Sequence, residues 1–461
     1  MNQFVFEKQQ KSTFIGMMIL GVICMVLTFV GDDAFHTRFW SNFLHNSVYF
    51  TGIAFGALFV LSASLLAYGG WHTIFKRVWE AYSLFLIVGL VLMGVVVAGV
   101  LGGFHHLYHW ADKASVEADE ILKGKSGFLN PMIYTIFTIG FVGIWFFIAQ
   151  RMRAISQDED QNGNESFSQH KKLKFWAAIF LPLGGFSSAA IIWQWVMSVD
   201  AHWYSTLFAW YCTASMVVTM YAFTLLILVY LRSKGYYALV TQEHLHDIGK
   251  YIFGVSIFWA YLWFSQFMLI WYANVGEETI YFKTRLEEYR PLFFLNLGIN
   301  FFIPFLVLIR NDTKRKVGSL VFVSIIVIFG HWLNFFLMIK PGVLHTAHEL
   351  AHHDTHKVGE NESEIKMHSV KTSQENHSDA NQAPHAAAVA THDESHNADT
   401  HVGHSDHAVT PAGFQFPGLL EIGTWIGFMG LFLYFVFWQL TRARLTPPND
   451  PFVGESYHHH V

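Results

Sequence analysis

One segment of the sequence brings together side chains that could move protons. Residues 193–211, WQWVMSVDAHWYSTLFAWY, lie between two long apolar runs and contain Asp200 and His202. A carboxylate inside a membrane is costly, by about 3 kcal/mol at a helix centre, so an acidic residue at a helix exit is a candidate for function. Either side chain could accept a proton from a hydroxyl group held nearby. The aromatic residues that would wall such a site are Trp193, Trp195, Trp203 and Tyr204.

A purely structural interpretation competes with this one. A short turn between two spans needs polar residues, and Trp and Tyr collect at membrane interfaces as anchors. Further polar residues lie near the ends of apolar runs, on the side of the membrane where we also expect Asp200. The candidates among them are Gln194, His105, His106, His109 and Glu277. His105 and His109 are four residues apart, as two metal ligands on one helix face would be. No second helix supplies a partner histidine there, so we expect no metal ion.

Polar residues inside the apolar runs are spaced as on single helix faces. Asn296 and Asn300 are four residues apart, His331 and Asn334 are three apart, and Gln266 lies in a separate run. An imidazole can change charge near neutral pH and pass a proton on, which makes these residues candidates for a proton path. The alternative is that they form hydrogen bonds between helices, worth about 0.6 to 2 kcal/mol each.

Composition and apolar runs predict the elements that must position these residues. The chain has 461 residues, of which 53% are hydrophobic and only 14% charged. This composition is typical of an integral membrane protein, and runs of this length indicate helices rather than barrel strands. We expect ten spans, near residues 13–30, 47–68, 82–104, 131–150, 173–197, 205–231, 248–274, 291–309, 318–340 and 418–440.

Basic residues predict the orientation of these spans. They gather before the first span, in every second loop, and after the tenth span, for example at Lys76 and Arg77. Such alternation places both termini in the cytoplasm. We expect an all-α fold of two four-helix bundles with peripheral first and last helices. The expected parts are residues 1–46 (first helix and external loop), 47–197 (first bundle), 198–340 (second bundle), 341–413 (a loop) and 414–461 (last helix and cytoplasmic tail).

The part between the ninth and tenth spans differs in composition from the rest. Residues 341–413 carry about half of the 27 histidines, with many acidic and small polar residues. Because this part has too few bulky apolar residues to form a core, we expect a disordered external loop. The irregular histidine spacing favours a solvated spacer over a defined metal site.

Several cofactors are disfavoured on this chain. Only two cysteines occur, Cys24 and Cys212, and both lie in apolar runs, so no iron–sulfur cluster is expected. Two membrane haems with paired histidine ligands would need four histidines at membrane depth, and only His331 lies clearly inside a span. No phosphate-binding or dinucleotide-binding glycine motif occurs in a suitable context.

Four segments carry a resemblance to a known family. They are the 193–211 segment, SKGYY at 233–237, EHLHDIGKY at 243–251 and YLWFSQFMLIWYANVGEET at 261–279. With the ten-span layout, the chain resembles the ActF-type subunits of bacterial alternative complex III, within the NrfD and polysulfide-reductase membrane-subunit family. The resemblance covers the second to the tenth span, except the histidine-rich part.

The resemblance implies a subunit of a quinol:cytochrome c, or other quinol:electron-acceptor, oxidoreductase in the bacterial inner membrane. Quinone or quinol is then the candidate cofactor, and haems and iron–sulfur clusters belong to extracytoplasmic partners. The implied partners are an ActC-like sister membrane subunit, iron–sulfur and multihaem cytochrome c subunits, lipids and, as a further candidate, a terminal oxidase. In such complexes the established quinol site belongs to the sister subunit, and Asp200 and His202 map onto no proven ligand.

Two further functions are compatible with the sequence. The chain could be a scaffold that docks the external redox subunits without a quinone site of its own. It could also be a secondary transporter, because Pro182 and Pro304 interrupt spans and His331 lies within one. In neither case would the chain be an enzyme alone.

Overall fold

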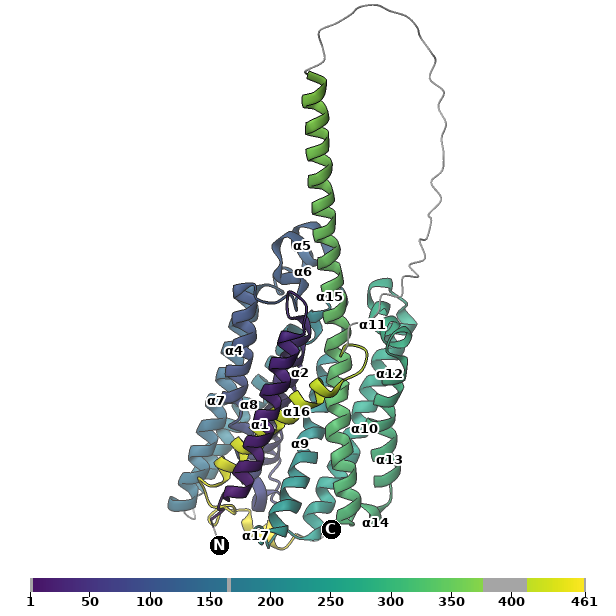
Figure 1. Cartoon of the computed structure of the whole chain (residues 1–461). Helices are drawn as coiled ribbons and strands as arrows, with labels where there is room; N and C mark the ends of the chain where they lie inside the picture. Colours follow the sequence, from purple (N-terminus) through teal and green to yellow (C-terminus); the bar gives the residue numbers. More distant parts are fainter. Residues whose placement is uncertain (1–2, 164–166, 376–412, 460–461) are drawn as a thin grey trace, which may run out of the picture. The chain divides into compact units, whose positions relative to one another are not determined.

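The chain folds into helices that match the expected membrane spans. The computed structural model describes the backbone of residues 3–163, 167–375 and 413–459, and the side chains of all these except 348–375. These ranges contain no strand, and ten of their helical segments are long and apolar enough to cross a membrane. This confirms the expected all-α membrane fold (Figure 1).

The bounds of the spanning helices are as follows. They are α1 (Lys8–Val30), α2 (Thr37–Leu66), α3 and α4 (Lys76–Ser83 and Leu86–Gly102), α7 (Pro131–Asn162), α8 (Ser168–Trp195), α9 (Leu207–Ser233), α10 (Gln242–Ala273), α12 and α13 (Arg290–Leu297 and Ile303–Leu308), α15 (Val317–Glu375) and α16 (Leu419–Leu440). Shorter helices connect them: α5 (Lys113–Ala118), α6 (Glu120–Lys125), α11 (Gly276–Glu287), α14 (Asn311–Lys314) and α17 (Val453–Tyr457).

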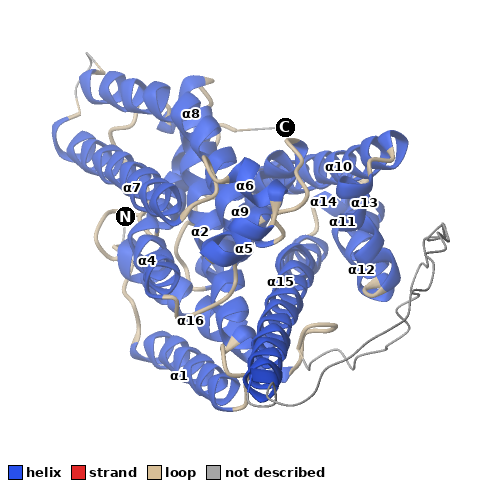
Figure 2. Cartoon of the chain, turned by 90° about the horizontal axis from the view of Figure 1, so that it is seen from above, coloured by secondary structure: helices blue, strands red, loops and turns tan. Residues whose placement is uncertain are grey.

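The chain divides into two units, residues 1–347 with 412–461, and residues 348–411. Within the first unit, α2, α4, α7 and α8 pack against one another as one four-helix group. Helices α9, α10, α12–α13 and α15 form the second, in which α15 is bonded to α9 and α12 through Asn334. Figure 2 shows α7 and α8 on one side and α10, α12 and α13 on the other, with α2 and α9 between them.

Helices α2 and α9 join the two groups because a small residue lets them approach. A Cβ atom on Gly52 of α2 would lie 2.6 Å from Cγ of Met216 on α9. Both helices are largely buried, with 83% and 78% of their most apolar windows shielded inside the protein. The polar residues on α9 therefore face protein and not lipid.

The first and last helices form a pair. A Cβ on Gly21 of α1 would lie 2.4 Å from Cα of Gly427 on α16, so the two backbones are in direct contact. Small residues allow such close packing in membranes. Helix α1 is peripheral, with only 17% of its window buried, whereas α16 also packs on α2 and α3.

Helix α15 is longer than the sequence predicts. The ninth span was expected to end near residue 340 and to lead into a disordered loop, but α15 continues through Pro341 to Glu375. The expectation of a loop is therefore wrong for residues 341–375. Low hydrophobicity rules out an independent core, yet it does not stop a helix that is already nucleated from growing. The rest of the expected loop, residues 376–412, lies outside the described residues.

Candidate functional site

The 193–211 segment forms a tight turn that packs against α15. Helix α8 ends at Trp195, and a 3₁₀ turn, η3 (Met197–Val199), leads to Asp200. Thr346 of α15 donates its hydroxyl hydrogen to the carbonyl of Val199 at 2.9 Å. A Cβ on Gly342, one helical turn earlier, would lie only 3.1 Å from Cβ of Asp200. The glycine and the threonine thus hold the turn close to α15.

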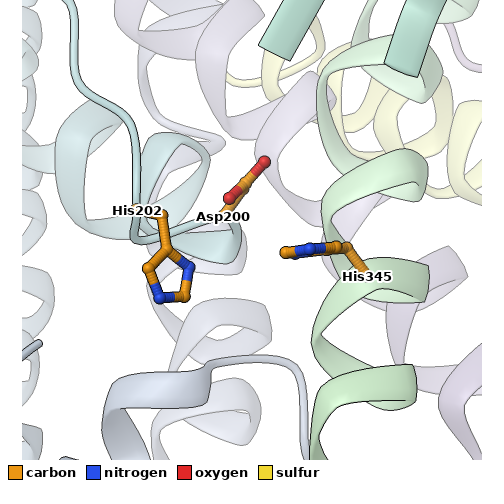
Figure 3. A group of neighbouring side chains, drawn as sticks. All are labelled: Asp200, His202 and His345. Atoms are coloured by element: carbon orange, nitrogen blue, oxygen red, sulfur yellow. The ribbon is translucent and has the colours of Figure 1, made fainter. Parts of the chain in front are cut away.

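This packing creates a group of titratable side chains, which we call the Asp200 cluster: Asp119, Asp200, His202 and His345. Ligand atoms of the last three all lie within 4.8 Å of one another (Figure 3). Asp119 Oδ2 lies 2.6 Å from Nε2 of His202, and both side chains are partly exposed, at 25% and 18%. The cluster therefore links a shielded carboxylate to the surface.

Asp119 is held in its charged form. Partial burial raises the pKa of its carboxyl group, but the hydrogen bond from His202 and those from the amides of Ile121 and Leu122 outweigh burial. The net pKa of Asp119 lies below its ordinary value. A carboxylate that remains ionised is a suitable partner for an imidazole that gains and loses a proton.

Beside the cluster lies a cavity of about 330 Å³, which we call the Trp193 cavity. Its aromatic walls include Trp193, Trp203 and Tyr204, and Lys125 of α6 lies at its edge. The Lys125 ammonium group donates to the carbonyl oxygens of Ala201, at 2.6 Å, and His202, at 3.2 Å. The indole N–H of Trp193 is buried and has no partner among the described side chains.

The surroundings of Lys125 also change its pKa. Burial lowers the pKa of its ammonium group, and this effect exceeds the opposing attraction of Glu277, Asp200 and Asp119. The cavity thus has one charged donor, the Lys125 ammonium, beside its aromatic walls. Such an arrangement suits a planar ligand that carries hydrogen-bond acceptors.

In the structure, the aromatic residues expected to wall the site and the side chains expected to accept protons lie in different places. Ala201 lines the Trp193 cavity, whereas the side chains of Asp200 and His202 belong to the neighbouring cluster. Trp195 does not line the cavity, because its indole donates to Thr138 Oγ1 at 2.9 Å in the first helix group. Gln194 has a similar internal role, donating to the carbonyl of Phe128 at 2.7 Å.

The three histidines after α4 have separate environments. His105 is buried, with Nε2 3.1 Å from the carbonyl oxygen of Val96, and burial lowers its pKa to about 4. His106 stacks on Phe35 with 4.1 Å between ring centroids. Only His109 approaches the cluster, with its ring 5.6 Å from that of His202. Glu277 lies in the first turn of α11 and is exposed.

The three asparagines expected on a proton path meet in one network, which we call the asparagine network: Tyr211, Ser215, Asn296, Asn300 and Asn334. Asn334 Oδ1 accepts hydrogen bonds from the hydroxyl of Tyr211 and from Nδ2 of Asn296, the latter at 3.0 Å. Asn334 Nδ2 donates to Ser215 Oγ at 3.0 Å, and Asn300 donates to Asn296 at 2.7 Å. All five side chains are buried.

A π-helical segment contains one of these asparagines. The segment η4 (Gly298–Phe302) interrupts α12–α13 and includes Asn300. Pro304 has no N–H to donate to the carbonyl of Asn300, which favours such an irregularity. Wide π turns are frequent at functional sites.

Gln266 and His331 lie apart from this network. Gln266 lines a small cavity of about 10 Å³, on the order of one water molecule, together with Arg285, Tyr211 and Asn334. His331 is buried edge-on against Trp259, and both its ring nitrogens lack a partner among the described side chains. The structure thus connects Gln266 to the asparagine network through a cavity and leaves His331 outside it.

Sequence reasoning missed three residues of this region, Asp119, Lys125 and His345, because they come from parts of the chain far from residues 193–211. It also missed a buried group of charged side chains around α3, which begins at Lys76. Glu80 accepts from Arg77 at 2.7 Å and from Arg153 at 2.5 Å, while Lys76 contacts Glu159 at 3.4 Å and also Asp450. From the sequence, Lys76, Arg77 and Arg153 served only to predict the orientation of the spans. The Arg77–Glu80 spacing of three residues was the one available signal for pairing.

Comparison of the sequence with family models and with curated proteins gives no match. The fold and the composition therefore define only the class of protein: the chain is an all-α, multi-pass membrane protein.

Proposed function

We propose that this chain is a membrane subunit of a quinol:electron-acceptor oxidoreductase and that it binds quinol in the Trp193 cavity. The observation that carries the proposal is the position of this cavity, which has aromatic walls and a charged donor, Lys125, and lies one residue from the Asp200 cluster. A benzoquinone-type ring needs flat apolar walls and a hydrogen-bonding partner for its oxygens. The family resemblance of the 193–211 segment supports the same chemistry.

The reaction releases two electrons and two protons from each quinol. The electrons pass to haems and iron–sulfur clusters of extracytoplasmic partner subunits, as the family resemblance implies. While no ion occupies the Asp200 cluster, His202 takes a proton from the quinol through a water molecule, because its side chain does not line the cavity, and Asp119 stabilises the resulting imidazolium. Both side chains are partly exposed, so the proton continues to the aqueous phase.

The topology fits this direction of proton release. The two termini lie at one end of the helices, and α5, α6 and α11 lie at the other (Figure 1). We place the termini in the cytoplasm of a bacterial cell and the Trp193 cavity at the periplasmic end, as the basic residues of the loops indicate. The external redox subunits would then dock over α5, α6 and α11, beside an ActC-like sister subunit.

Replacing Lys125 tests the quinol site. The variant Lys125→Met, in the assembled complex, removes a charged donor from the edge of the cavity. Such a hydrogen bond is worth about 1.5 to 3 kcal/mol, so kcat/KM for quinol should fall roughly 10- to 100-fold. Lys123→Met is the matched control, because Lys123 lies on the same helix but is exposed and does not line the Trp193 cavity. Equal turnover in both variants, at equal assembly, would support the scaffold function instead.

A second function, proton transfer through the second helix group, is supported by the asparagine network. This network and its adjoining cavity reach from Asn300 to Arg285, whose side chain is bonded to the carbonyls of Leu337 and Met338. Side-chain amides and a water molecule could pass a proton along such a row. Replacing Asn334 with Leu should lower the number of protons released per electron, whereas His331→Phe, outside the network, should leave it unchanged. An unchanged ratio in Asn334→Leu would refute the path.

The transporter function has a separate test. The purified chain, reconstituted alone in liposomes, would have to move a solute without partner subunits. We expect no such transport, because the proposed role requires the electron acceptors of a complex.

A further inference from the structure

We propose that Asp200, His202 and His345 bind one divalent transition-metal cation of the zinc type. This site goes beyond the quinol-binding role, because its three side chains do not line the Trp193 cavity. Their ligand atoms already lie within 4.8 Å of one another. Two imidazoles and one carboxylate form a usual zinc ligand set, in which a fourth position remains open for water.

The orientation of His202 favours a metal ion. Its Nε2 is bonded to Asp119 at 2.6 Å, which leaves Nδ1 as the free ring nitrogen. Figure 3 shows a ring nitrogen of His202 facing the side of Asp200 and His345. A carboxylate that accepts the second N–H of a metal-binding histidine fixes the tautomer and makes the ring a better ligand. Asp119 supplies this carboxylate.

Asp200 offers a carboxylate oxygen that has no other use. Its Oδ1 is shielded from solvent and accepts no hydrogen bond from any described group. A buried carboxylate oxygen without a donor is costly, because it has lost its water and gained nothing in return. A cation between Asp200 and the two histidines would remove this cost.

The backbone around the site is held in place before any ion binds. The Thr346 hydroxyl is bonded to Val199, and Gly342 lets α15 approach Asp200 to within van der Waals contact. His345 lies three residues after Gly342, on the same face of α15. Tetrahedral zinc bonds of about 2.0 to 2.2 Å require ligand atoms closer than 4.8 Å, so the three side chains would turn toward one another as the ion binds. A bound ion would tie the α8–α9 connection to α15.

Histidine modification read by peptide mass spectrometry tests the site one residue at a time. The full chain, purified and stripped with a chelator, is treated with diethyl pyrocarbonate over a zinc titration. We expect zinc to protect His202 and His345 together, at a lower concentration than it protects the histidines of residues 348–411. Protection of His345 only in step with those histidines would overturn the proposal.

Variants give a second, independent measurement. Cobalt replaces zinc in such sites, and its visible absorption would report one tight site per chain. Asp119→Asn keeps all three ligands but should weaken cobalt binding about 10- to 100-fold, the range found when a metal-bound histidine loses its outer partner. His106→Gln, a histidine stacked on Phe35 outside the site, is the matched control and should bind cobalt as the wild-type chain does. Equal affinity in Asp119→Asn and His106→Gln would refute the ligand geometry, whatever the outcome for quinol turnover.

Discussion

The asparagine network predicts a measurable coupling between two helices of the second group. Asn334 makes three hydrogen bonds, with Tyr211, Asn296 and Ser215. Asn296 makes two, with Asn334 and Asn300. The two asparagines share one of these bonds, so replacing both with Leu removes four bonds in total.

Hydrogen bonds between membrane helices are worth about 0.6 kcal/mol on average. The free energy of unfolding should then fall by about 1.8 kcal/mol in Asn334→Leu, by about 1.2 in Asn296→Leu and by about 2.4 in the double variant. The double variant therefore loses about 0.6 kcal/mol less than the two single losses combined. Reversible unfolding of the purified chain in mixed micelles, monitored by circular dichroism, would measure these values. Additive losses would show that the two side chains do not interact and would refute the network.

Three further predictions concern other parts of the chain. Gly21→Ala should destabilise the α1–α16 pair by about 1 to 3 kcal/mol in the same assay, because the added methyl group would collide with the backbone of Gly427. The control Gly16→Ala should leave the stability unchanged, because a methyl group there has no neighbour within 4 Å. Glu80→Gln leaves the buried Arg153 without its carboxylate, while Arg77 keeps Asp160, and should cost about 3 to 5 kcal/mol. Lowering the pH from 6.5 to 4 should destabilise the wild-type chain more than His105→Gln, by up to about 3 kcal/mol, because His105 takes up a proton near pH 6.5 when unfolded but only near pH 4 when folded. Equal pH dependence of the two melting curves would contradict the assignment of His105.

The helices were predictable because each depends mainly on its own residues. An apolar run long enough to cross the bilayer has to form a helix, so ten spans follow from composition alone. The spacing of Asn296 and Asn300 likewise follows from helix geometry. In contrast, His345 falls in a part whose composition predicts a loop, and the helix there continues from α15.

The site was only partly predictable because it depends on contacts between distant residues. Asp200 and His202 stand out by chemical type, but their partners Asp119 and His345 are 81 and 145 residues away from Asp200 in the sequence. Aromatic composition predicted the walls of a site, yet it could not separate Trp193, which lines the cavity, from Trp195, which packs inside the first helix group. Such differences depend on how the turn packs against α6 and α15.

The most direct test of the quinol-binding role is labelling of the assembled complex with a photoreactive quinone analogue, followed by peptide mass spectrometry. The proposed function predicts crosslinks to residues 193–206 and 124–129 of this chain, and their loss when an excess of quinol is present. Crosslinks confined to the sister membrane subunit, with none on these two segments, would contradict it.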